Sequence, residues 1–296
     1  AARKGVEEEL IKRTNKILNE KNLFINTENK IIWENYPVAK IKKGENYLSP
    51  EIEIITDDSL PSNERKKLEQ FLKKWMSSHV DEILGDLINL TKVKIEDQYL
   101  RALAYQLYEN NGVLKRKNID EIIKLISKEE RKKLWNMGVK IGRYHVFLPK
   151  MLKPKAVVLR TTLWKIYNNV SSNLDIPKFG LNFVTNKNYN EKFLLLCGFE
   201  KFKDYFIRID ILEKLFINII DATLDRKFKI SPEMMNLLGC TKENFLKLMN
   251  LMDYKKSKDN DTYYYFSPNN KKNKDKLTND KSKTNPFSKL LALNIK

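Results

Sequence analysis

Six side chains that can carry positive charge lie within 16 residues of one another, on both sides of Leu148-Pro149. They are Lys140, Arg143, His145, Lys150, Lys153 and Lys155. Cations on one face of a strand, followed by the free N–H groups of a helix start, can bind phosphates. The same pattern is typical of an edge strand whose charges prevent aggregation. Phosphate binding and a solvated edge therefore remain as alternatives for this segment.

No other chemistry is indicated by a motif. The sequence contains no G-x-x-x-x-G-K-[ST] phosphate loop, no G-x-G-x-x-G fingerprint, no G-x-S-x-G elbow and no H-E-x-x-H pair. Cys197 lies in an apolar run and Cys240 at a tight turn, so both are predicted to be packed, reduced thiols. Acidic pairs such as Asp57-Asp58 are predicted to be solvated. We therefore expect no catalytic residue, no metal site and no cofactor site in this chain.

The net charge favours an anionic partner. Of the 296 residues, 56 are Lys or Arg and 38 are Asp or Glu, which gives a net charge of +18. An excess of this size commonly serves to neutralise nucleic-acid phosphates. Lys supplies 46 of the basic residues and Arg only 10, as an AT-rich coding sequence would produce by itself. Because Arg is the better bidentate reader, the charge is also compatible with a merely solubilising surface.

Other classes of protein are excluded by composition. Two Cys and two His cannot supply a disulfide scaffold or a four-Cys zinc site. No apolar run approaches the roughly 20 residues of a membrane span, and the N-terminus lacks the apolar core of a signal peptide. We expect a cytoplasmic protein with no membrane partner. Because the chain begins at Ala1 rather than Met, we also expect a fragment of a longer protein.

Hydrophobic periodicity predicts an α+β chain that is mostly helical. Helix starts are expected at Ser59–Ser62, at Pro154 and after Thr241. Ser127 and Glu130 have the form of a capping box. The four predicted parts are an N-terminal helix with a β-meander (1–58), a helical domain (59–170), a winged-helix-like domain (171–266) and a disordered basic tail (267–296).

Two details of the predicted strands bear on the basic segment and on the meander. Period-two alternation from residue 139 to residue 148 changes phase at Gly142, which predicts one strand with a β-bulge. In the meander, Lys43–Asn46 is predicted to form the turn before the last strand. After the bulge, Tyr144, Val146 and Leu148 would share one face of the strand, and Arg143, His145 and Phe147 the other.

The order helix, strand, helix, helix-turn-helix and hairpin between residues 189 and 266 is that of a winged helix. In a DNA-binding member the last helix enters the major groove, and here it would expose Lys242, Glu243, Lys247 and Asn250. Because this face has no Arg, backbone contact or protein docking is favoured over sequence-specific reading. Lys255 and Lys256 in the hairpin complete the candidate nucleic-acid-binding residues.

The segments Gly138–Gly142, His145–Pro149 and Leu152–Pro154 resemble the C-terminal region of certain bacterial superfamily 2 ATP-dependent helicases, relatives of the mitochondrial degradosome RNA helicase. The order and spacing of the pieces carry the resemblance, which extends over about residues 1 to 255. The further matching pieces are Pro37–Ala39, Leu163–Trp164, Gly198–Phe199, Ile207–Glu213, Pro232–Met235 and Leu238–Cys240.

In that family, two RecA-like motor domains with the phosphate loop and the acidic magnesium motif lie upstream. The resemblance therefore implies a non-motor region that is inactive alone, with ATP and magnesium bound only by the absent motor. Its expected role is sequence-tolerant binding of RNA or DNA beside the motor domains. The alternatives are a protein-docking scaffold for a nuclease or ribonucleoprotein partner and, less favoured, a free-standing winged-helix transcription regulator.

Overall fold

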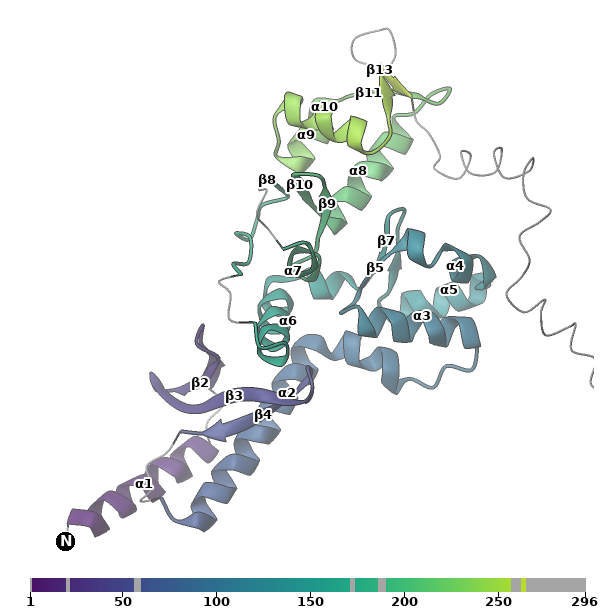
Figure 1. Cartoon of the computed structure of the whole chain (residues 1–296). Helices are drawn as coiled ribbons and strands as arrows, with labels where there is room; N and C mark the ends of the chain where they lie inside the picture. Colours follow the sequence, from purple (N-terminus) through teal and green to yellow (C-terminus); the bar gives the residue numbers. More distant parts are fainter. Residues whose placement is uncertain are drawn as a thin grey trace, which may run out of the picture. The chain divides into compact units, whose positions relative to one another are not determined.

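The computed structural model describes residues 2–19, 22–55, 60–170, 174–185, 190–256 and 262–264 (Figure 1). They form helices and small antiparallel sheets, so the predicted α+β class is confirmed. The chain divides into two compact units. The first unit contains the described residues up to Phe216 together with Leu237–Gly239, and the second contains those of Ile217–Asn236 and from Cys240 onward.

The first unit begins with helix α1 (Ala2–Leu18) and a four-stranded antiparallel meander. Its strands, paired in chain order, are β1 (Phe24–Ile25), β2 (Lys30–Trp33), β3 (Tyr36–Asn46) and β4 (Ser49–Ile54). The predicted turn at Lys43–Asn46 is wrong, because β3 continues through it and the turn follows at Tyr47–Leu48. A Cβ on Gly44 would lie 1.9 Å from the Ser49 carbonyl oxygen, so only glycine fits at this position. Gly44 lies where the register between β3 and β4 shifts, between Lys42 and Asn46.

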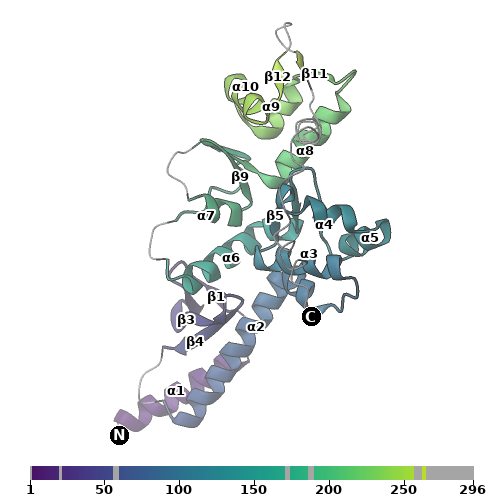
Figure 2. The ribbon, with the colours of Figure 1, turned by 45° about the vertical axis from the view of Figure 1, so that its right-hand side comes forward.

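Helix α2 (Ser62–Lys92) is the long axis of the first unit's core. A buried apolar stripe with helical spacing, which includes Leu72, Leu84 and Leu87, runs along it. The helix packs against α1, against β4 of the meander and against helices α3 (Gln98–Glu109) and α6 (Pro154–Tyr167), as the views in Figures 1 and 2 agree. The stripe therefore holds the meander and the following helices in one core.

Short helices follow α3. They are the 3-10 helix η1 (Arg116–Asn118), α4 (Asp120–Leu125) and α5 (Lys128–Asn136). The predicted capping box is confirmed, since the Ser127 hydroxyl accepts from the Glu130 N–H and the Glu130 carboxylate accepts from the Ser127 N–H. Gly138 follows α5 with a φ of 81°, a conformation that glycine adopts without strain.

The predicted bulged strand at 139–148 is wrong. The segment forms two antiparallel strands, β6 (Lys140–Ile141) and β7 (His145–Phe147), with β7 in the middle of a sheet of order β5-β7-β6, where β5 is Val113–Lys115. The turn between β6 and β7 encloses the carboxylate of Glu213, and a Cβ on Gly142 would lie 2.3 Å from it. The reversal of the chain between β6 and β7 is therefore stabilised by a carboxylate that lies about 70 residues later in the sequence.

The rest of the first unit surrounds α6, which begins at Pro154 as predicted and follows the 3-10 helix η2 (Pro149–Leu152). Helix α7 (Glu191–Leu196) precedes a hairpin that leads into α8 (Ile209–Asp221), within which the boundary between the units falls. The strands of this three-stranded sheet, in the spatial order β8-β10-β9, are β8 (Phe183–Thr185), β10 (Tyr205–Arg208) and β9 (Phe199–Phe202).

The second unit contains the end of α8 and five further elements. They are β11 (Lys227–Lys229), α9 (Pro232–Leu238), α10 (Lys242–Leu251), β12 (Lys255–Lys256) and β13 (Thr262–Tyr264). Their strands form a sheet of order β11-β13-β12. Phe228 packs edge-on against Tyr254 and is tilted against Tyr263 in a buried aromatic cluster. The predicted start of α10 is confirmed, because the Thr241 hydroxyl accepts from the Asn244 N–H. The predicted tail from residue 267 lies outside the described residues.

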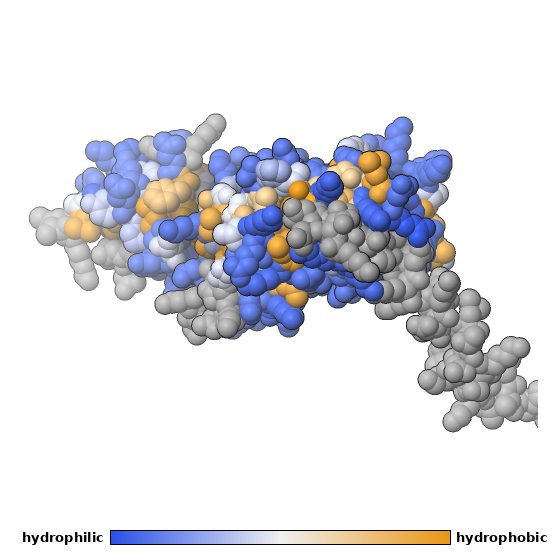
Figure 3. Space-filling view, turned by 90° about the horizontal axis from the view of Figure 1, so that it is seen from above, coloured by the Kyte–Doolittle hydropathy of each residue, from blue (hydrophilic) through white to orange (hydrophobic). Residues whose placement is uncertain are grey.

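Hydrophilic side chains cover most of the face in Figure 3, and apolar ones appear on it in separate patches. Among the helices that the structure describes, none is both long enough and apolar enough to cross a membrane.

Candidate nucleic-acid interface

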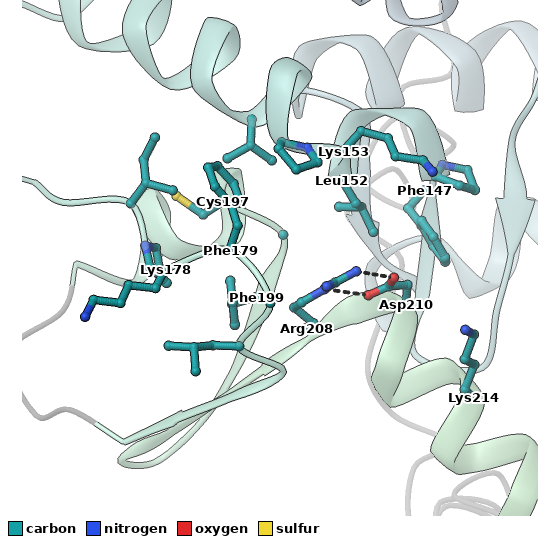
Figure 4. Close-up of a pocket in the computed structure, with 18 of the residues that line it drawn as sticks. Phe147, Leu152, Lys153, Lys178, Phe179, Cys197, Phe199, Arg208, Asp210 and Lys214 are labelled. Atoms are coloured by element: carbon teal, nitrogen blue, oxygen red, sulfur yellow. Dashed lines mark hydrogen bonds and ion pairs between the residues drawn. The ribbon is translucent and has the colours of Figure 1, made fainter. Parts of the chain in front are cut away.

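A pocket of about 320 Å³ lies in the first unit, where residues far apart in sequence meet (Figure 4). Its walls come from β6, from the start of α6, from the loop at residues 176–181, from the β9–β10 hairpin and from the start of α8. Buried apolar side chains, among them Phe147, Val157 and Phe199, line its floor. The pocket therefore combines an apolar base with walls from five segments.

Four lysines from four of these segments line the pocket. They are Lys140 on β6, Lys153 before α6, Lys178 on the loop and Lys214 on α8. Lys153, Lys178 and Lys214 are exposed and Lys140 is half-buried. Within the part of the chain that the structure describes, none of the four ammonium groups makes a hydrogen bond or an ion pair. Their charges are therefore available to an anion from solvent.

The fifth cation of the pocket is neutralised. Arg208 donates from Nε to one Asp210 oxygen at 3.1 Å and from a terminal nitrogen to the other at 2.6 Å. Figure 4 shows this pair with Lys153, Lys178 and Lys214 on different sides of it. Asp210 is the one acidic side chain among the described residues that line the pocket. The pocket thus carries an excess of four positive charges.

The start of α6 adds to the positive potential. Lys153 is the residue that precedes the helix, and Pro154 and Val157 of its first turn also line the pocket. The N-terminal end of a helix carries a partial positive charge from its aligned peptide dipoles. The lysines and the helix end therefore act in the same direction on an anion in the pocket.

Cys197 also lines the pocket, and burial raises the pKa of its thiol to about 12. Burial likewise raises the pKa of Cys240 in the second unit to about 11. At neutral pH both side chains are therefore protonated thiols.

The structure separates the six cations of the basic segment. Lys140 and Lys153 line the pocket, whereas Lys150 pairs with Asp86 at 3.0 Å and Lys155 is exposed outside it. The Arg143 guanidinium lies 5.6 Å from the centre of the Phe216 ring. Two of the six thus share one site with lysines from other segments.

The expected contact of His145 with nucleic acid does not hold in the structure, because this side chain is only 1% exposed. Its Nε2 lies 2.8 Å from Glu200, which also accepts from Lys115 at 2.8 Å. On the other side, Glu213 accepts from the backbone N–H groups of Arg143, Tyr144 and His145 at 2.5, 2.8 and 2.9 Å. These three backbone N–H groups are therefore occupied by a carboxylate of the same chain.

The buried ion pair between His145 and Glu200 shifts the pKa values of both side chains. Burial lowers the pKa of His145, but hydrogen bonds and charges from Glu200 and Glu213 outweigh it, so the pKa is raised. Burial raises the pKa of Glu200, but hydrogen bonds and charges from His145 and Lys115 outweigh it, so the pKa is lowered. The pair is therefore a charged, structural clamp between β7 and β9.

This clamp predicts a pH dependence of stability. Protonated His145 stabilises the fold fully below its unfolded pKa of 6.5, and this contribution is lost as pH rises through its higher folded value. Ionised Glu200 stabilises the fold above 4.5, and its contribution is lost as pH falls through its lower folded value. The free energy of unfolding, measured with urea, should differ most between the full chain and its His145→Gln variant from about pH 4.5 to pH 6.5. The difference should become smaller at high pH. An equal difference at every pH would contradict a charged His145.

The second-unit cations form a separate set. Lys242 and Lys247 are exposed on α10, and Lys247 pairs with Glu243 at 2.5 Å. The hydrogen bond and the charge of Lys247 lower the pKa of Glu243. Lys255 and Lys256 are exposed on β12.

Sequence patterns missed three residues of the pocket: Lys178, Phe179 and Lys214. The first two had a usable signal, since Pro177 and Gly180 on either side of them mark a turn that presents a cation next to an aromatic ring. No sequence signal marked Lys214, because a single lysine on an amphipathic helix is typical of a solvent-exposed face.

Comparisons of the chain with protein-family models, with curated proteins and with solved structures find no match in any of the three.

Proposed function

We propose that this chain binds the phosphate backbone of RNA or DNA, as the non-motor C-terminal region of a cytoplasmic ATP-dependent helicase of superfamily 2. The observation that carries the proposal is the pocket in which Lys140, Lys153, Lys178 and Lys214 present unneutralised charges. Such a group of cations suits a chain of phosphates, which gains affinity by releasing counterions. The helicase assignment rests on the resemblance in sequence, and ATP and magnesium would act in the motor upstream.

The chemistry of the pocket favours binding that tolerates any base sequence. Lysine is a flexible point charge, whereas base reading commonly uses the planar fork of arginine. Arg208 is the arginine of the pocket. Its Nε and one terminal nitrogen donate to Asp210, and the other terminal nitrogen donates to the Asn182 side-chain oxygen at 3.5 Å. The pocket therefore offers charge to a backbone and no arginine fork to a base.

The second unit supports the same class of function. The predicted winged-helix-like domain (171–266) included α7, β9 and β10, which belong to the first unit. The later elements α8, β11, α9, α10, β12 and β13, with the strand order β11-β13-β12, have the order expected of a winged helix, and we include this narrower assignment in the proposal. Helix α10 would then be the recognition helix. Because Glu243 neutralises Lys247 there, contact with the backbone or with a protein is favoured over base reading.

Fluorescence anisotropy with labelled oligonucleotides of several sequences tests the proposal on the full chain. We expect micromolar affinities that are similar for all sequences and that fall at least tenfold between 50 and 200 mM salt, roughly as expected for three or four phosphate contacts. Binding that does not change with salt would overturn the proposal. Absence of binding at both salt concentrations would also overturn it, and would favour the protein-docking alternative.

A further inference from the structure

We propose that this pocket holds one unpaired nucleotide of a single strand, with its base against Phe179 and its phosphate among the lysines. The inference rests on the proposed function, and it specifies the form of nucleic acid that the site takes. It is carried by the size of the pocket, by an exposed aromatic ring at its edge and by the turn that holds this ring.

The volume suits a nucleotide. About 320 Å³ is at the lower end of the range of small-molecule sites, so the cavity has room for a base and its phosphate. A duplex keeps its bases stacked inside and offers a protein its backbone and groove edges, so a base enters such a pocket only when it is unpaired. An intact duplex would therefore leave the cavity empty.

Phe179 is the exposed aromatic side chain of the pocket. It is 54% exposed, whereas Phe147 and Phe199 in the floor are 1% and 6% exposed. Its neighbour Leu181 is 43% exposed, so two large apolar side chains face solvent on the same loop. Bases stack on such rings whatever their sequence, because every base has a π-face. An exposed ring beside free cations is thus the combination that single strands need.

The loop presents this ring on a defined turn. The Leu181 N–H donates to the Lys178 carbonyl at 3.2 Å, and Gly180 at the third position of the turn has a φ of 94°, as glycine readily adopts. Next in the chain, the Asn182 carbonyl accepts from the Arg208 N–H at 3.0 Å. The turn is therefore anchored to β10, and Lys178 and Phe179 are consecutive residues of it (Figure 4).

The positions of the lysines indicate which side of the pocket takes the phosphate and which side takes the base. Lys140, Lys153 and Lys214 come from the walls on β6, before α6 and on α8, whereas the loop contributes Phe179 and one further lysine. A phosphate among the lysines then leaves the base for the apolar side of the pocket. The neighbouring phosphate along the strand can meet Lys178, so the strand crosses the loop.

The test measures the full chain against a labelled 12-nucleotide strand, alone or annealed to its complement. We expect the single strand to bind at least tenfold more tightly than the duplex. Phe179→Ala should weaken single-strand binding roughly tenfold and leave duplex binding and the melting temperature unchanged. Phe179→Trp should retain single-strand binding. The matched control is Phe24→Ala, since Phe24 is 52% exposed in β1, and it should change nothing.

Each other outcome has a defined meaning. Equal binding of strand and duplex, or no effect of Phe179→Ala, would overturn the inference, while the proposed function would stand if the binding still falls with salt. No binding of either form would overturn the proposed function itself. A free mononucleotide that binds as tightly as the strand would overturn the assignment to a strand.

Discussion

Replacing Arg160 with methionine is expected to lower the free energy of unfolding by about 3–5 kcal/mol, because three carbonyl oxygens lose a donor at a cost of roughly 1–3 kcal/mol each. Arg160 is 0% exposed and donates to the carbonyl oxygens of Asn111, Met151 and Leu196, the last two at 2.8 Å. Asn111 lies two residues after α3, Met151 lies within η2 and Leu196 ends α7, so one guanidinium connects three segments. Methionine fills much of the space and donates to none of them.

Arg160 keeps its charge throughout the physiological range. Burial lowers the pKa of its guanidinium to about 10, which is still well above neutral pH. Urea unfolding at pH 7 measures the loss. The matched control is Arg13→Met, because Arg13 is exposed on α1 and pairs there with Glu9, and its loss should stay within about 0.5 kcal/mol. Equal losses in the two variants would contradict the role given to Arg160.

Replacing the four pocket lysines with glutamate together is expected to weaken binding of an oligonucleotide about 100-fold or more at moderate salt. The changed residues are Lys140, Lys153, Lys178 and Lys214. Each substitution removes a cation that can neutralise a phosphate and adds a charge that repels it. Because none of the four ammonium groups has a partner within the described residues, folding should be unaffected. The melting temperature checks this second expectation.

A control with the same change in net charge separates the pocket from the general charge of the protein. Lys66 and Lys74 on α2 and Lys128 and Lys132 on α5 are exposed, and none of them lines the pocket. Changing these four to glutamate should weaken binding by far less than the pocket variant does. Equal losses would mean that the total charge, and not the pocket, binds the oligonucleotide.

The features that sequence predicted correctly depend on neighbouring residues. Pro154 begins α6, Ser127 and Glu130 form their capping box, and the Thr241 side chain caps α10. Each of these signals acts over three or four residues, so the sequence alone contains the physical cause. The features that it missed depend on distant residues. The β6–β7 turn closes on Glu213, and no local pattern could show that Gly142 makes room for that carboxylate.

The residues of the candidate site also fall into those that local sequence indicated and those that depend on tertiary packing. Lys140 and Lys153 were found from their local density of charge, and both line the pocket. His145 was assigned to the same group, but Glu200, 55 residues away, pairs with it in the core. Lys214 reaches the pocket through the position of α8, which depends on the packing of the whole first unit. Charge density in the sequence therefore located the region, and tertiary packing selected the residues.

Three of the segments on which the proposed helicase assignment rests meet in the first unit. Gly138–Gly142 and His145–Pro149 contain the β6–β7 hairpin, and Ile207–Glu213 supplies the carboxylate that its turn encloses. Gly142 and Glu213 depend on one another, because any larger residue at the glycine would collide with the carboxylate. These three segments thus form one packing motif, and Lys140 of the first of them lines the pocket.

The dependence of binding on salt tests the central claim most directly. For a single strand whose backbone forms an ion pair with each of the four lysines, the logarithm of the binding constant should fall against the logarithm of salt concentration with a slope of about −3. Replacing Lys140, Lys153, Lys178 or Lys214 singly with glutamine should make this slope shallower by about 0.7 each time. A slope near zero for the unchanged chain, or an unchanged slope in all four variants, would contradict binding of a phosphate backbone in this pocket.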